Sequence, residues 1–210
     1  MNRRRSITAA ILSAALVTSV AACTTTTTTD GSAPAATVTG TATGSATDIV
    51  FAQSMIPHHR QAIEMANIAL DPQAEASPEV RKLATAIKEA QDPEIEQMNT
   101  WLQQWGAPTA MPGAADPDAM AGMDHSGHDM AGMTMSGMMT TEDMDALRQA
   151  TGAEFDSMWL QMMIAHHEGA VLMAEQVKAQ PGNSDVTTLA DQVITAQKQE
   201  IDTMKQLLAQ

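Results

Sequence analysis

Apolar residues recur every three or four positions over four long stretches of the chain, which is the spacing of one face of an α-helix. Start and stop signals place the first two predicted helices at residues 47–70 and 77–105. The other two are predicted at residues 141–179 and 184–208, and Gly152 is a candidate break in the third. The pattern therefore predicts an all-α protein.

The sequence repeats itself across these helices. Residues 163–174 align with residues 55–66 at an offset of 108, and residues 196–204 align with residues 90–98 at an offset of 106. Each unit thus holds one His-His segment and one Gln-x-x-Glu-Ile-x-x-Met segment. Two repeated helical hairpins predict an antiparallel four-helix bundle. We expect the first helices of the two hairpins to be parallel and diagonal in it.

The repeated histidine pairs face the predicted core. At 100° per residue, the two histidines of each unit lie on either side of the inward stripe, with a methionine between them one turn earlier. In a bundle of parallel first helices, both sets should meet at one level. The side chains concerned are His58, His59, His166, His167, Met55 and Met163.

A site of imidazoles and thioethers favours a soft metal ion. Imidazole binds copper, zinc, iron and nickel, and thioether sulfur shifts the preference toward Cu(I). Without a metal, four neutral imidazoles in an apolar core would leave several polar atoms unsatisfied, at roughly 1–3 kcal/mol each. The alternative is that the histidines are hydrogen-bonded core residues and the methionines only fill space.

Four further residues accompany the histidines at a distance. Met65 and Met173 lie about 9–10.5 Å from them along the helix axis, so we expect them to be core residues or a second soft site. Glu94 and Glu200 recur in the repeat. They are candidates for metal ligands, for partners that orient the histidines, or for surface charges.

Residues 106–140 have no helical period but contain eight methionines. A structureless stretch of this length inside a compact domain is usually functional or disordered. Clustered thioethers suit Cu(I) or Ag(I) in an oxidising compartment, where thiols would oxidise. The alternative is low-complexity drift. The candidate ligands in this segment are Met120, Met123, His125, His128, Met130 and Met133.

The N-terminal residues are predicted to be an export signal and a tether. Three arginines precede an apolar stretch of about 14 residues, which is too short to span a membrane. Val-Ala-Ala-Cys at residues 20–23 resembles a bacterial lipobox, so we predict a signal peptide at 1–22 and lipidation of Cys23. The alternative is an ordinary cleavage with Cys23 as a bystander. Residues 23–46, rich in Thr, Ala and Gly, are predicted to be a flexible tether.

Composition argues against a nucleic-acid partner. The chain has 25 acidic and 11 basic residues and a formal net charge of −14. Binding to nucleic acid needs a basic face that displaces counterions. An acidic surface attracts cations instead, or simply keeps the protein soluble.

The repeated motif resembles that of a known family. Met-Ile-x-His-His followed by Ala and Met, with Asp seven residues before the first Met, is similar to the pattern of the DUF305 family. The resemblance covers both copies and predicts a DUF305-like domain over residues 47–210 with residues 106–140 as an insert. It implies an exported or membrane-anchored bacterial protein with a ferritin-like helical bundle. Some members of the family are associated with copper.

We therefore expect an exported, lipid-anchored copper-binding or copper-buffering protein, with Cu(I) favoured. It would be monomeric, because the internal repeat can stand in for a dimer. It would be secreted if the lipobox is not used. The chain has no Glu-x-x-His motif of di-iron proteins and no hydrolase or phosphate-loop motif, so a binding protein is favoured over an enzyme.

Three other functions stay open at this point. The same bundle could serve a metal-dependent redox protein or electron carrier. It could hold non-covalent haem, whereas covalent c-type haem is excluded because no Cys-x-x-Cys-His occurs. It could also be a structural scaffold that binds no metal, because a helical bundle by itself does not imply a function.

Overall fold

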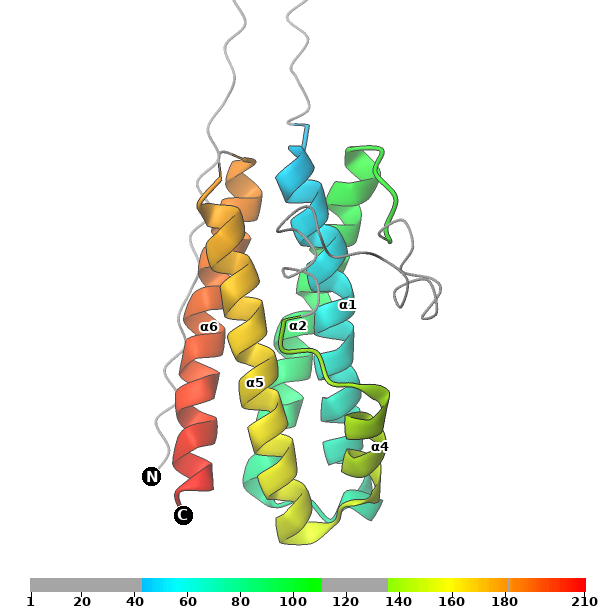
Figure 1. The fold of residues 1–210 in the computed structure, drawn as a ribbon, viewed down its shortest axis with the longest axis vertical. Helices are drawn as coiled ribbons and strands as arrows, with labels where there is room; N and C mark the ends of the chain where they lie inside the picture. The colour runs from blue at the N-terminus through cyan, green and yellow to red at the C-terminus, as the bar shows by residue number, and fades with distance from the viewer. Residues whose placement is uncertain (1–42, 111–135, 181) are drawn as a thin grey trace, which may run out of the picture. The chain divides into compact units, whose positions relative to one another are not determined.

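The structure is a computed structural model that describes residues 43–110, 136–180 and 182–210. All regular elements among these residues are helical, which confirms the all-α prediction (Figure 1). No described helix has the combination of length and apolar character that crossing a membrane requires. The elements are α1 (Ala46–Leu70), η1 (Pro72–Ala74), α2 (Pro78–Gln104), α4 (Thr141–Gln149), α5 (Gly152–Lys178) and α6 (Ser184–Leu208).

The long helix predicted over residues 141–179 is two helices, and the break lies beside the glycine that the sequence indicated. Helix α4 ends where Ala150 turns to an extended backbone, with ψ of 150°. Gly152 then has φ of +60°, a conformation that glycine adopts without steric cost. The other three predicted helices begin and end within one residue of their observed bounds.

Two aspartates in equivalent positions of the repeat join the hairpins through helix caps. The Asp48 carboxylate of α1 accepts a hydrogen bond from the Asn183 main-chain N–H, 3.0 Å away, at the start of α6. The Asp156 carboxylate of α5 accepts one from the Ser77 N–H, 3.1 Å away, at the start of α2. Each therefore neutralises an unpaired donor at a helix N-terminus of the other hairpin.

Helices α1 and α5 pack against each other in antiparallel directions, so the predicted parallel orientation was wrong. The residues of α1 from Ala62 onward share a buried cluster with Phe155 to Met163 of α5. The N-terminal half of α1 shares a second cluster with the C-terminal half of α5. The Trp159 indole N–H donates to the Met65 carbonyl oxygen at 2.9 Å, which joins the two helices directly. Figure 1 shows the two ribbons running in opposite directions.

The connection between the hairpins explains this direction. Helix α4 contacts both α1 and α5, and its Met144 and Leu147 belong to the cluster at the C-terminal end of α1. The chain therefore returns along the bundle before α5 begins. A short loop after α2 would have started α5 at the opposite end.

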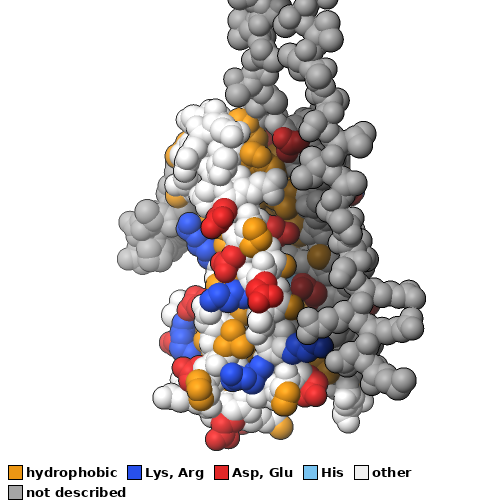
Figure 2. Space-filling view, turned by 180° about the vertical axis from the view of Figure 1, so that it is seen from behind, with side chains coloured by type: hydrophobic (Ala, Val, Ile, Leu, Met, Phe, Trp, Pro, Cys, Tyr) orange, Lys and Arg blue, Asp and Glu red, His pale blue; other side chains and the backbone are white. Residues whose placement is uncertain are grey.

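The described surface is mixed in charge. Leu172 and Leu208 are its only exposed large hydrophobic residues. Figure 2 shows acidic and basic side chains interspersed over one face. The interior is more unusual, because it contains four buried histidines.

Candidate metal centre

Four histidines meet halfway along α1 and α5. His58 and His59 come from α1, and His166 and His167 from α5; none is more than 1% exposed. The ring centroids of His58 and His166 are 3.8 Å apart, with their planes tilted by 39°. The pairs meet at one level even though the helices are antiparallel, because each pair lies near the middle of its helix. We call these four side chains the histidine layer.

One histidine of each hairpin is paired with a carboxylate from the neighbouring helix. His59 Nε2 lies 2.7 Å from Glu94 Oε2 of α2, and His167 Nε2 lies 2.7 Å from Glu200 Oε2 of α6. The glutamate side chains are 19% exposed, whereas the histidine side chains are fully buried. Of the three roles left open for these glutamates, their geometry is that of histidine partners.

The last residues of the methionine-rich segment cross the histidine layer. The Ser136 carbonyl accepts a hydrogen bond from His58 Nε2–H at 3.1 Å. The Gln61 side chain donates to the Met139 carbonyl at 2.8 Å and accepts from the Met139 N–H at 2.7 Å. On α5, a Cβ at Gly169 would lie 2.0 Å from the Ser136 oxygen, so only glycine permits this approach. We call residues 136–139 the strap.

Five ring nitrogens of the histidine layer have no hydrogen-bond partner of normal geometry among the described residues. They are Nδ1 of all four histidines and Nε2 of His166. A buried polar atom without a partner costs roughly 1–3 kcal/mol. The donor set therefore fits an ion that imidazole nitrogens bind.

Burial keeps two of the imidazoles neutral. The pKa of His58 is lowered to about 3, chiefly by burial and also by the neighbouring His59 and His167, against the opposing effect of the Ser136 hydrogen bond. Burial likewise lowers the pKa of His166 well below its usual value. The charges of His58, His167 and His59 add to the effect, and a contact with the His58 main chain opposes it. Neutral imidazole is the form that binds a metal, so protons do not compete for these lone pairs near neutral pH.

The contact between the His58 and His166 rings limits what the layer can hold as it stands. At a centroid distance of 3.8 Å, no porphyrin fits between the two rings. Nor does any group of three or more His, Cys, Asp or Glu side chains in the described part of the chain have the arrangement of a metal site. An ion bound by both rings would require the rings to rotate apart. An ion bound with the rings as they stand would take its remaining ligands from thioethers.

The four bundle methionines lie on both sides of the histidine layer. Met55 and Met173 belong to one buried cluster, and Met65 and Met163 belong to the other. The prediction that Met55 and Met163 share one level with the histidines was therefore wrong. Antiparallel helices place them on opposite sides, each with a methionine of the other repeat in its cluster.

Several predicted site residues lie outside the described residues. They are Cys23, Met120, Met123, His125, His128, Met130 and Met133. The strap itself carries Met138 and Met139, both half-buried.

Sequence reasoning missed three features near the layer. Gln91 and Gln197 are each 3% exposed, and their Oε1 atoms lack a partner among the described residues. They recur one turn before the two glutamates, and that recurrence was the available signal. The strap contact was missed because a carbonyl oxygen has no sequence signature. The one sequence feature that reflects this contact is a difference between the two repeats: Gln61 in the first aligns with Gly169 in the second.

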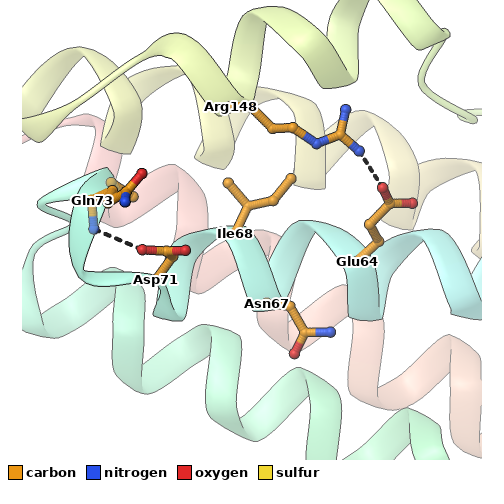
Figure 3. A pocket seen from close by; sticks show the side chains of 7 residues that line it. Glu64, Asn67, Ile68, Asp71, Gln73 and Arg148 are labelled. Carbon is orange, nitrogen blue, oxygen red and sulfur yellow. Dashed lines mark hydrogen bonds and ion pairs between the residues drawn. The ribbon is translucent and has the colours of Figure 1, made fainter.

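A surface pocket of about 380 Å³ lies apart from the histidine layer, between α4 and the C-terminal end of α1 (Figure 3). Its Arg148 forms an ion pair with Glu64, and the Asp71 carboxylate accepts from the Gln73 N–H at 2.8 Å. These charged groups already have partners within the protein. The pocket therefore offers less unused bonding capacity than the histidine layer.

The sequence matches that of a known protein family. The sequence model of a domain of unknown function, DUF305, matches residues 48–208. The chain belongs to the DUF305 family. No functionally curated protein matches it.

Solved structures of the family share its fold. A DUF305 protein of Streptomyces coelicolor, described as a candidate secreted protein, is 33% identical, with a TM-score of 0.65 over 78% of this chain and 92% of that one. A DUF305 fragment of Deinococcus radiodurans is 28% identical, with a TM-score of 0.65 over 80% and 98% of the two chains. CopM in its Cu(II)-bound form is 39% identical, with a TM-score of 0.58 over 77% and 95%. CopM has also been solved in Cu(I)-bound, Ag-bound and apo forms.

Proposed function

We propose that this DUF305 protein binds copper, with Cu(I) favoured, at the histidine layer and its flanking thioethers. The observation that carries the proposal is the set of five buried imidazole nitrogens without partners in one layer. Burial holds His58 and His166 in the neutral, metal-binding form. The four buried methionines supply soft donors on both sides of the layer. The copper- and silver-bound forms of CopM support this choice of metal.

The proposal extends to the methionine-rich segment and to the place of action. Methionines and histidines of residues 106–140 would capture the ion, and the strap connects this segment to the layer. Cleavage at the lipobox and lipidation of Cys23 would anchor the protein to the membrane outside the cytoplasm. The protein would act there as a monomer. The role is copper binding and buffering.

The test is an anaerobic titration of the full chain with Cu(I) against a chromophoric chelator. The variant His58→Ala/His166→Ala removes the central rings of the layer. Deletion of residues 111–135 removes most of the methionine-rich segment and spares the strap. Arg60→Ala/Glu168→Ala is the matched control, because these exposed residues occupy equivalent positions beside the two histidine pairs.

Each outcome of the titration has one meaning. Loss of tight binding in the histidine variant alone supports a site in the bundle. Loss in the deletion alone places the site in the methionine-rich segment and leaves the histidines structural. Failure of the unmodified chain to compete with the chelator overturns the copper proposal. Circular dichroism of each variant checks that the helices persist.

A redox role is the second candidate, because CopM has been solved with both Cu(I) and Cu(II). It requires that one bound ion cycle between the two states without leaving. Reversible voltammetry of the loaded protein, with no copper released to the chelator, would favour an electron carrier. Release on oxidation would favour buffering.

A further inference from the structure

Two carboxylate–histidine pairs stand at equivalent places in the two hairpins. In each, a fully buried imidazole has its Nε2 atom 2.7 Å from a glutamate oxygen on the adjacent helix: His59 with Glu94, and His167 with Glu200. The same contact occurs in both copies of the internal repeat. A chance surface ion pair would not bring a buried ring to the same atom and the same distance in both halves.

The hydrogen-bond partners determine which ring nitrogen carries the proton. An ionised carboxylate can only accept a hydrogen bond, so the nitrogen facing it must carry hydrogen. The same holds for His58, because its Nε2 faces the Ser136 carbonyl oxygen, which has no hydrogen to donate. In all three rings Nδ1 is buried and has no partner among the described residues. In its neutral form, such a ring carries its lone pair on Nδ1.

We propose that Glu94, Glu200 and the Ser136 carbonyl are positioning groups. They hold His59, His167 and His58 in the Nε2–H tautomer, with the Nδ1 lone pairs as the metal-binding atoms. His166, whose ring nitrogens make no hydrogen bond of normal geometry with the described residues, is the one ring whose tautomer no such partner fixes. The assignment of tautomers stands on the hydrogen bonds alone. Only the assignment of Nδ1 as the ligand atom rests on the proposed copper function.

This arrangement has a physical advantage for a metal site. A histidine whose second nitrogen donates to a carboxylate is fixed in orientation, and its free nitrogen becomes a stronger donor. The outer helices α2 and α6 thereby act on the layer through one carboxylate each. Near each carboxylate lies an exposed acidic residue, Glu96 or Asp202, which points away from the layer and offers a matched control.

The first test reads the tautomers in the metal-free full chain at mildly alkaline pH. Histidine is labelled with ¹⁵N, and long-range ¹H–¹⁵N correlation separates the nitrogen that carries hydrogen from the one that does not. We expect the Nε2–H pattern for His58, His59 and His167. In Glu94→Leu, His59 should change to a mixture of tautomers while His167 stays unchanged, and in Glu200→Leu the reverse should hold. The unaffected repeat shows in each case that the fold persists.

Two results of this test overturn the proposal. One is the Nδ1–H pattern at His59 or His167 in the unmodified chain. The other is an unchanged pattern at both histidines in the leucine variants. Neither result depends on metal binding, so a failed copper proposal leaves this test intact.

The second test uses Ag(I) as the probe ion, in competition with a chromophoric chelator. The loss of such a partner typically weakens metal binding roughly 10–100-fold, and we expect that change in Glu94→Leu/Glu200→Leu. Glu96→Leu/Asp202→Leu should bind like the unmodified chain. Equal affinity in both double variants would overturn the positioning role for the metal. Absence of Ag(I) binding in the unmodified chain would overturn the choice of Nδ1 as ligand atom, because the site would then not take a soft ion.

Discussion

The two hairpins are built on one plan, but the strap distinguishes them. Both contribute a buried histidine pair, a glutamate partner and an aspartate cap. On α1, His58 donates to the Ser136 carbonyl, and Gln61 bonds to Met139 at both ends of its amide. On α5, the residue equivalent to Gln61 is Gly169, and the His166 ring makes no hydrogen bond of normal geometry with the described residues. One repeat thus anchors the strap through polar groups, and the other makes room for it.

This difference shows at which positions the residues of the two repeats can differ. The core-facing residues of both halves serve the same layer, so they keep the same chemistry. The residues under the strap differ, because the single strap lies against both α1 and α5 and makes different contacts with each helix. The following predictions separate what the halves share from what each does alone.

The largest effect is expected from Gly169→Val. A side chain there meets the Ser136 carbonyl oxygen, for which even a Cβ would lie at 2.0 Å. Either the strap lifts and His58 Nε2–H loses its acceptor, or α5 shifts. Overpacking and a lost buried hydrogen bond each cost about 1–3 kcal/mol, so we expect a loss of about 3 kcal/mol in urea unfolding. Glu168→Val, an exposed neighbour in the same helix, is the control; an equal loss there would contradict the role of the strap.

The next effect is acid destabilisation through the layer. The pKa of His58 is lowered from 6.5 to about 3 by burial, so between these values the unfolded chain binds a proton that the folded chain does not. Stability is therefore complete above pH 6.5 and falls as the pH drops toward 3. For a buried neutral histidine the loss between pH 7 and 5 is about 2 kcal/mol. Urea unfolding at several pH values should show a flatter profile for His58→Gln than for the unmodified chain.

The same measurement compares the halves. The pKa of His166 is also lowered, so His166→Gln should flatten the profile as well. A profile that is unchanged in both variants would show that neither ring is held neutral by burial.

The smallest effects are expected at the helix caps. Asp48 is 1% exposed, and its carboxylate accepts from the main-chain N–H groups of both Ser45 and Asn183. Asp156 is half-buried, and among the described residues its carboxylate accepts from the main-chain N–H of Ser77. We expect Asp48→Ala to cost about 2 kcal/mol and Asp156→Ala about 1 kcal/mol in thermal or urea unfolding. Equal costs would show that the second hydrogen bond of Asp48, to the Ser45 N–H at the start of α1, adds nothing to the free energy of unfolding.

The local pattern predicted much of this fold because it depends on interactions within one helix. Ser77 followed by Pro78 marks the start of α2, and Gly152 marks the break before α5. The histidine pairs could be assigned to the core because helical periodicity defines which face is apolar. Their meeting at one level was correctly expected, although the parallel direction used to expect it was wrong.

The sequence by itself determined the helices, the repeat and the inward direction of the histidines. The tertiary structure alone decided that α1 and α5 are antiparallel, that the thioethers of Met55 and Met163 fall on opposite sides of the layer, and that a carbonyl oxygen from the strap caps His58. The physical reason is that periodicity defines the face of a helix but not its direction or its neighbours. Those depend on the path between α2 and α5, where the packing of α4 against the end of α1 turns the chain back.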